Sequence, residues 1–412
     1  MSSVTTPTPI ALQSSRIPES LAVTSHQRIA SIDSLRGLVM VIMALDHVRD
    51  FFTNATFNPL DLVQTTPALF LTRWITHLCA PVFVLLAGTG VYLYGAQGRS
   101  KSEAARFLLT RGLFLVILEF TVIHLGWNLS LDYHFILAQV IWMLGWSMIA
   151  LAALIFLPMW ILVAIAVFMV GGHNLLDGLM ADNLGIPRWL WMILHQPGPI
   201  EITPERQFFV LYPLVPWIGV MAAGYALGQV FLWPPQERQR WLLGLGLGLT
   251  LAFVLLRWLN IYGDPRPWLP QSSSVLTFLS FINTEKYPPS LMFLLMTLGP
   301  GLILLAVFDR LEKAGLLVRP LIVFGQVPLF YYALHLILIH LLAVIFSYVR
   351  YGQATWLFGA NWMFRFGVPE DYGYELPFVY LIWLGVVVVL YPACLWFASV
   401  KRRRKESWLS YL

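Results

Sequence analysis

The sequence predicts an all-α, polytopic integral membrane protein with about ten transmembrane helices and both termini in the cytosol. Three observations support this prediction. The chain is 58% hydrophobic and only 11% charged, with a mean hydropathy of +0.72, whereas soluble globular domains are about 25% charged. Apolar runs of helical length recur along the chain, and the loops between them alternate in charge. Most of the surface is therefore expected to face lipid.

The apolar runs give the predicted helices in order. A helix crosses the hydrocarbon core with about 20 mostly apolar residues. Runs of about this length occupy 34–52, 68–95, 107–127, 135–156, 208–231, 241–259, 290–308, 323–349 and 376–398. A shorter run at 159–173 follows Pro158 and brings the expected count to ten.

Loop charges set the predicted orientation, because basic residues collect on the cytosolic side of a membrane. With the N-terminus inside, the cytosolic loops hold Arg99, Lys101, Arg106, Arg238, Arg240, Arg310, Lys313 and Arg319, and the tail holds the basic run 401–405. Most acidic loop residues, such as Asp132, Asp177 and Asp371, fall on the opposite side. Losing one helix would place the basic tail outside, so ten spans fit better than nine or eleven.

The composition also bounds the domains and partners. Residues 1–27 are polar, rich in Ser, Thr and Pro, and lack the apolar segment of a signal peptide, so we expect a disordered cytosolic tail. One transmembrane domain is expected over 28–400, with a basic cytosolic tail at 401–412. The basic residues serve topology, which argues against nucleic-acid binding. Cys79 and Cys394 lie in apolar runs without CxxC spacing or a Cys/His cluster, so no metal site is expected.

The first helix carries the most unusual side chains, since charges within a span are costly and therefore rare. Arg36 and His47 are eleven positions apart, which places them on one face about 16 Å apart along the axis. Asp33 falls on nearly the same face. This spacing suits a ligand with an anionic head, held by Arg36 at the cytosolic boundary, and a long tail whose reactive end meets His47.

His47 is the first candidate for a catalytic base. Asp46 or Asp50 would orient its imidazole and raise its basicity. The structural alternative is that Arg36 reaches to the interface, Asp46 pairs with Arg49, and His47 is an ordinary polar contact.

His77 is the second candidate, in the outer third of the second helix at nearly the depth of His47. Arg73 precedes it by four positions and is expected on the same face. A structural role for His77 is the alternative.

Other buried polar side chains are weaker candidates. Glu119 and His335 are expected to line the same site, together with Asp33, Asp50 and Arg73. Arg106 and Arg111, at the inner end of the third helix, would assist Arg36 with phosphates, or else simply anchor that helix at the interface.

Specific motifs of the first two helices resemble known membrane acyltransferases. An Arg, ten residues and a His in the first helix resemble the acyltransferase-3 pattern. SIDSLRG and APVFVLLAG are similar to the heparan-α-glucosaminide N-acetyltransferase family, and LDHVRDFF, TRWITHLCAPVFVLLAGTG and KYPPSLMFLLMTLGP resemble its bacterial members. Beyond the first two helices the likeness lies mainly in helix order and loop character.

The resemblance implies an enzyme that takes an acyl group, most simply acetyl, from cytosolic acetyl-CoA and delivers it to a sugar or glycan acceptor on the extracytoplasmic side. It also implies a multi-pass protein of the cell inner (plasma) membrane. Arg36 and His47 match the two acyltransferase-3 motif residues. The lysosomal enzymes have Asn at the position of His47 and their catalytic His in the first outer loop, but residues 53–67 here contain no His. His47 or His77 must then take that role.

A proton-coupled transporter is the rival class, because buried His and Asp residues suit proton relays. Against it, the sequence lacks a pair of interrupted helices in matching halves. The sequence leaves the oligomeric state open, and a homodimer is one arrangement that it allows.

Overall fold

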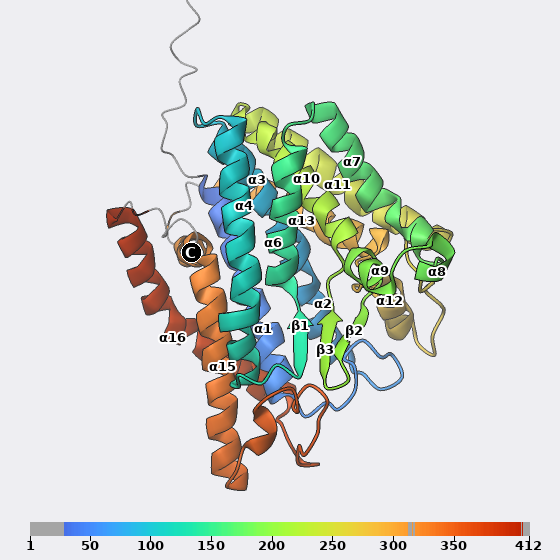
Figure 1. Ribbon diagram of the computed structural model, residues 1–412, viewed down its shortest axis with the longest axis vertical. Helices are drawn as coiled ribbons and strands as arrows, with labels where there is room; N and C mark the ends of the chain where they lie inside the picture. Colours follow the sequence, from blue (N-terminus) through green and yellow to red (C-terminus); the bar gives the residue numbers. More distant parts are fainter. Residues whose placement is uncertain (1–28, 312–314, 316–317, 405, 407–412) are drawn as a thin grey trace, which may run out of the picture.

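The structure is a computed structural model that describes residues 29–311, 315, 318–404 and 406. The predicted disordered tail at 1–27 and most of the predicted basic tail lie outside these residues. Within them the protein is mostly helical (Figure 1). Seven helical stretches are long and apolar enough to cross a membrane: Pro67–Gly95, Lys101–Asn128, Leu214–Leu232, Pro235–Leu259, Leu291–Leu311, Pro328–Tyr351 and Leu376–Arg403.

Three more helices occupy the remaining predicted spans. Helix α1 (Ala30–Phe52) has 23 residues but carries five charged side chains. Helices α6 (Val140–Leu154) and α7 (Met159–Gly171) are strongly apolar but have only 15 and 13 residues. The chain is thus a multi-helix protein with a membrane-spanning composition, and ten crossings remain a prediction.

Several predicted single helices are interrupted. The second span consists of α2 (Pro67–Ile75), a 3-10 turn η2 (Thr76–Leu78) and α3 (Cys79–Gly95). The third consists of α4 (Lys101–Leu118), a π-helical turn η3 (Glu119–Ile123) and α5 (His124–Asn128). The predicted helix at 323–349 is divided at Val327 into α14 (Arg319–Gln326) and α15 (Pro328–Tyr351), because Pro disfavours helical backbone at the residue before it.

A three-stranded sheet corrects the all-α prediction. Strands β1 (Phe135–Ala138), β3 (Arg206–Val210) and β2 (Gly198–Thr203) lie in that order, with β1 parallel and β2 antiparallel to β3. The predicted helices at 135–156 and 208–231 are therefore wrong over their first residues, which are extended. Figure 1 shows the sheet at the lower end of α6 and α10 (Leu214–Leu227). This end carries the loops predicted to be extracytoplasmic and is called the outer end below.

Short elements fill the long outer loops. They are η4 (His173–Leu176), α8 (Ala181–Leu184), α9 (Arg188–Leu194), α12 (Ser274–Ile282) and η6 (Thr355–Leu357). The remaining long elements are α11 (Pro235–Leu259), α13 (Leu291–Leu311) and α16 (Leu376–Arg403), with a 3-10 turn η5 (Gly228–Leu232) after α10.

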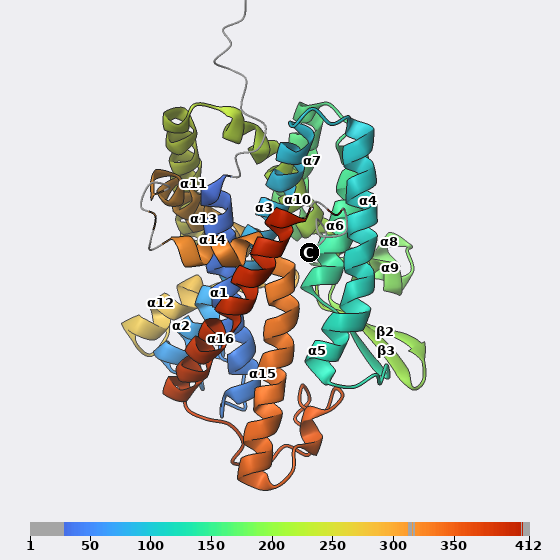
Figure 2. The same ribbon diagram turned by 90° about the vertical axis from the view of Figure 1, so that its left-hand side faces the viewer.

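Helix α1 lies in the middle of the bundle. It packs against α14 most extensively, and also against α13, α15, α16 and α3; Figure 2 shows α14 lying across it. Two glycines permit the close approach of α1 and α14. A Cβ atom on Gly37 would lie 1.8 Å from the Leu321 carbonyl oxygen, and one on Gly325 would lie 1.8 Å from that of Asp33. Any larger residue would force the two helices apart.

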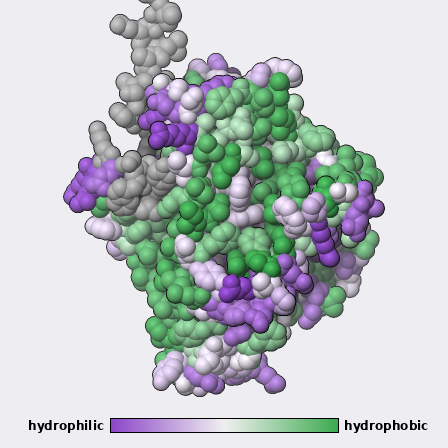
Figure 3. Space-filling model, in the orientation of Figure 1, coloured by the Kyte–Doolittle hydropathy of each residue, from purple (hydrophilic) through white to green (hydrophobic). Residues whose placement is uncertain are grey.

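The outer surface of the bundle is suited to lipid. Only 22% of the most apolar window of α11, and the same share of α16, is buried inside the protein. Exposed apolar residues on these helices include Leu251, Leu255, Leu381 and Val388. In Figure 3 hydrophobic residues cover much of the visible face, and hydrophilic residues gather mainly toward its ends. Such a large apolar surface indicates a membrane environment.

One buried ionic cluster joins the inner ends of three helices. The Asp309 side chain of α13 is fully buried and accepts hydrogen bonds from Arg238 of α11, from Nη2 at 2.8 Å and from Nε at 3.2 Å. Gln239 donates to the same carboxylate at 3.0 Å, and the Ser31 hydroxyl of α1 at 3.2 Å. All the oxygens of this buried carboxylate are thereby supplied with donors.

Candidate functional site

A chain of ion pairs lies at the outer half of α1. Asp46, Arg49 and Asp50 are three and four positions apart, so they share one face of the helix. Arg49 Nη2 donates to Asp46 Oδ1 at 2.7 Å and to Asp50 Oδ1 at 2.6 Å. Arg73 of α2 donates to the other oxygen of Asp46 and, at 3.2 Å, to Thr76 Oγ1. This pairing offsets the cost of burying charges in the bundle.

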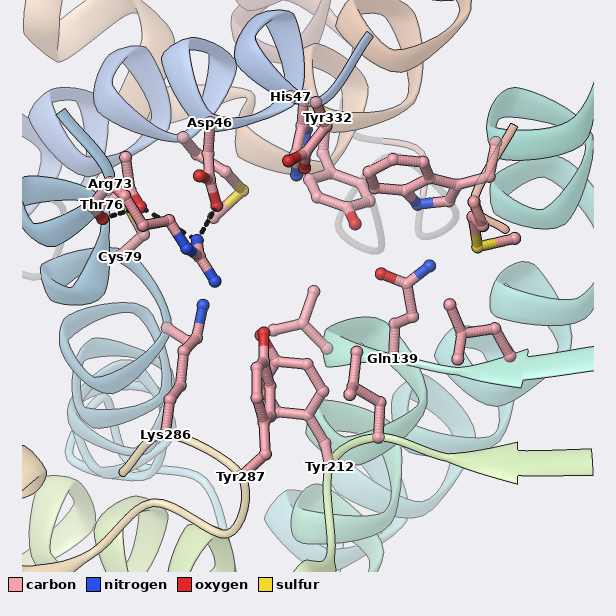
Figure 4. Close-up of a pocket in the computed structure, with 18 of the residues that line it drawn as sticks. Asp46, His47, Arg73, Thr76, Cys79, Gln139, Tyr212, Lys286, Tyr287 and Tyr332 are labelled. Carbon is pink, nitrogen blue, oxygen red and sulfur yellow. Dashed lines mark hydrogen bonds and ion pairs between the residues drawn. The ribbon is translucent and has the colours of Figure 1, made fainter. Parts of the chain in front are cut away.

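These ion pairs border a cavity of about 270 Å³ (Figure 4). Helices α1, α2 and α15 form one side of it, and the sheet and the outer loops form the other. The polar residues that line it are Asp46, His47, Asp50, Arg73, Thr76, Gln139, Tyr212, Lys286, Tyr287 and Tyr332. The cavity therefore combines cations, carboxylates, an amide, phenols and an imidazole in one partly open space.

The loop between α12 and α13 supplies the third cation. In Figure 4 Lys286 points toward Arg73, while Tyr287 lies beside Tyr212 across the cavity floor. The Lys286 ammonium is 5.1 Å from the centre of the Tyr287 ring. Burial alone would raise the pKa of the Tyr287 phenol, but the charges of Lys286 and Arg73 outweigh burial and lower it. The wall around Lys286 thus has a positive potential.

Charge does not balance around the cavity. Asp46 and Asp50 contribute two negative charges, whereas Arg49, Arg73 and Lys286 contribute three positive ones. A buried excess of positive charge favours a ligand that carries an anionic group.

His47 contacts a second histidine. Its Nδ1 lies 2.7 Å from Nε2 of His335 on α15, and the two rings stack with centroids 4.9 Å apart and planes 7° apart. Trp127 of α5 packs edge-on against His47, with centroids 4.9 Å apart. His47 lines the cavity, whereas His335 is fully buried behind it and is not among the lining residues.

This arrangement differs from the predicted orientation of His47 by Asp46 or Asp50. Both Asp46 oxygens accept hydrogen bonds from arginines, and Asp50 pairs with Arg49. Among the described residues, neither carboxylate is hydrogen-bonded to His47. The imidazole partner is His335, which was expected to line the site and instead supports a residue that does.

The second candidate base, His77, faces away from the cavity. It lies in the 3-10 turn η2, is buried, and packs against Phe293 of α13 with ring centroids 5.2 Å apart. Neither ring nitrogen has a hydrogen-bond partner within the described part of the chain. Its neighbours Thr76 and Cys79 line the cavity, but His77 does not.

Glu119 has a structural position. Its carboxylate accepts a hydrogen bond at 2.8 Å from the backbone nitrogen of Trp142, in the first turn of α6. It thereby satisfies a donor at the start of that helix. Glu119 lies in the π-helical turn η3 and does not line the cavity.

The predicted phosphate-binding residues lie apart from the cavity. Arg36 Nη1 donates at 3.2 Å to Asp33 and at 3.2 Å to the Gly325 carbonyl of α14, near the inner end of α1. Arg106 is exposed and Arg111 half-buried on α4, whose main packing partner is α6 rather than α1. The structure therefore does not group all three arginines around one site.

Reasoning from the sequence missed several cavity residues. Lys286, Tyr287 and Tyr212 come from loops that fold back over the bundle, and Tyr332 and Trp127 come from distant helices. The motif KYPPS, which contains Lys286 and Tyr287, was the one signal that pointed to this loop.

Fold and site together define a polytopic membrane protein with a charged cavity beside the outer half of its first helix. Residues 28–262 match the family described as heparan-alpha-glucosaminide N-acetyltransferase, catalytic, over more than half of the 412-residue chain. The chain belongs to this family. The match includes the charged residues of α1 and α2 but ends before Lys286 and His335. No curated protein shows a significant match to the chain.

Proposed function

We propose that this protein is a membrane acetyltransferase that moves an acetyl group from acetyl-CoA to an amine or hydroxyl of a sugar or glycan. The observation that supports it most is the position of His47, within the family-matched part of the chain, at the wall of the charged cavity. Among the described residues, no hydrogen bond occupies its Nε2 atom. An imidazole nitrogen with a free lone pair is the group that general-base catalysis needs.

The donor fits the site in part. The cavity of about 270 Å³ is close to the lower limit of typical ligand pockets, roughly 300–1,000 Å³. It therefore suits the thioester end of the donor beside one sugar group, but not the nucleotide. We place the phosphates near Arg36, about 16 Å away from His47 along α1, which matches a long ligand that enters from the cytosolic side.

In the proposed reaction acetyl-CoA supplies a thioester carbonyl carbon. Nε2 of His47 removes the proton of the acceptor amine or hydroxyl while the acceptor atom bonds to that carbon. Gln139 and the phenols of Tyr212, Tyr287 and Tyr332 are among the uncharged donors that line the cavity and would stabilise negative charge on the carbonyl oxygen. As the C–S bond breaks, His47 returns the proton to sulfur, which leaves the CoA thiol and a neutral imidazole.

Reconstituted protein tests the proposal. Proteoliposomes are supplied with acetyl-CoA and a panel of sugar acceptors that begins with glucosamine, and the released CoA thiol is measured. His47→Ala is expected to lower turnover by roughly 10²–10⁴-fold, the usual contribution of a positioned base. His134→Ala is the matched control, because His134 is 64% exposed in an outer loop.

The same assay tests which of the two histidines acts as the base and from which side of the membrane each substrate binds. His77→Ala should cost much less than His47→Ala; the opposite order would transfer the role of base to His77. Near-normal turnover in both variants of an active preparation would refute the site. Acetyl-CoA added only to the cytosolic face should support acetylation of an acceptor held on the other face.

A further inference from the structure

His335 lies directly behind His47 and makes two hydrogen bonds, one through each ring nitrogen. Its Nε2 is 2.7 Å from Nδ1 of His47, and its own Nδ1 is 2.9 Å from the carbonyl oxygen of Tyr331, one helical turn earlier in α15. Its ring stacks on that of Tyr331, with centroids 5.1 Å apart and planes 15° apart. His335 is completely buried, so its orientation is set by protein contacts alone.

The partners decide which nitrogens carry protons. A carbonyl oxygen only accepts hydrogen bonds, so Nδ1 of His335 must be protonated. In a neutral ring Nε2 of His335 then holds a lone pair and accepts from Nδ1–H of His47. The proton of neutral His47 is thereby held at Nδ1, on the side away from the cavity, and its Nε2 keeps a lone pair.

We infer that His335 is a positioning residue that fixes the tautomer and the ring plane of His47, so that Nε2 is always the basic atom. As a contribution to catalysis, this inference rests on the proposed function; as a statement about protonation, it does not. The inference gives α15 a role in the site, although this helix lies outside residues 28–262, which match the family.

A neutral partner has a chemical consequence. In the common Asp–His arrangement, the carboxylate both orients the imidazole and stabilises the imidazolium that forms. His335 brings no negative charge, and both carboxylates nearby are bound to arginines. The positioning effect of His335 should therefore appear mainly in kcat through orientation, with little change in substrate binding.

Nitrogen NMR on protein labelled with ¹⁵N-histidine in lipid measures the tautomer directly. The chain has nine histidines, so the signals of His47 are assigned by their loss in His47→Gln. In the wild type we expect a protonated Nδ1 and an unprotonated Nε2. In His335→Leu, which removes the acceptor, we expect His47 to populate the other tautomer.

Two variants separate positioning from loss of a buried ring. His335→Gln keeps an acceptor oxygen near the position of Nε2 and should retain the tautomer of His47 and most of kcat. His335→Leu should lower kcat at least about tenfold, part of the roughly 10²–10⁴-fold effect of a positioned base, with KM nearly unchanged. His340→Leu is the control: His340 is buried on the same helix, but its nitrogens contact the carbonyls of Gly126 and Leu357. It should leave the His47 signals unchanged.

Either of two outcomes would overturn the inference. One is a wild-type His47 that is protonated at Nε2, and the other is an unaltered His47 tautomer in folded His335→Leu. Because the NMR measurement needs no turnover, these outcomes are distinct from failure of the proposed acetyltransferase activity. If the wild type is inactive with every acceptor but shows the expected tautomer, the proposed function fails and the hydrogen-bond assignment stands.

Discussion

Replacing Asp309 by Ala should destabilise the protein strongly. Its fully buried carboxylate pairs with Arg238, whose side chain is only 10% exposed. Removing one partner of a buried pair leaves the other charge without compensation, which typically costs about 3–5 kcal/mol. Gln239 and Ser31 also lose their acceptor, so the upper half of that range is expected.

A double variant provides the control. In Arg238→Leu/Asp309→Leu neither charge remains, and apolar replacement of a buried pair is often neutral or stabilising. The double variant should therefore recover most of the free energy of unfolding that Asp309→Ala loses. Equilibrium unfolding in detergent micelles, followed by the fluorescence of the 17 tryptophans, measures all three proteins. The reasoning is refuted if Asp309→Ala costs less than about 1 kcal/mol, or if the double variant is as unstable as the single one.

Three further predictions concern ligands and topology. Lys286→Met should weaken binding of a substrate that carries a phosphate, sulfate or carboxylate by about 1.5–3 kcal/mol. The KM for glucosamine 6-phosphate should rise and that for glucosamine should not, while Lys286→Arg should behave like the wild type. Equal effects on both sugars would contradict a role of Lys286 in binding the anionic group. Arg36→Ala should weaken CoA binding by a similar amount in calorimetry, and unchanged affinity in a folded variant would exclude it as a phosphate ligand. Cysteines placed at the exposed positions Ser272 and Thr355 should react with a membrane-impermeant thiol reagent added to intact cells. Background labelling should be low because both native cysteines are buried. Labelling only after permeabilisation would disprove the ten-helix topology.

The helices could be predicted because length and hydropathy decide what crosses a bilayer. The run that begins at Phe135 shows where this reasoning fails. The residues FILA are all apolar and would fit the first turn of a membrane helix. A short apolar run does not by itself distinguish a strand from a helix. Pairing with β3, about 70 residues later, selects the extended form. That pairing is a tertiary event without a local signal.

The candidate site, too, could be predicted from the sequence only in part. The sequence offered the pairing of Asp46 with Arg49 as an alternative to a catalytic role, and this pair is present because the two residues lie one turn apart on the same helix. The sequence did not predict that Arg73 would take Asp46 away from His47, or that His335 would replace it. Lys286 joins the cavity only through the folding of a loop, so its role depended on contacts between segments far apart in sequence.

The short helix α7 has a consequence for the surrounding bilayer. Its 13 residues span about 20 Å, whereas the hydrocarbon core is about 30 Å thick. Trp160 and Phe168 are 72% and 73% exposed on this helix, so lipid rather than protein meets its apolar side. Lipid next to a short apolar segment thins, at a cost of a fraction of a kcal/mol per Å of mismatch. The outer leaflet beside α7 should therefore be depressed, which would shorten the path that a polar glycan travels from bulk water to the level of the sheet.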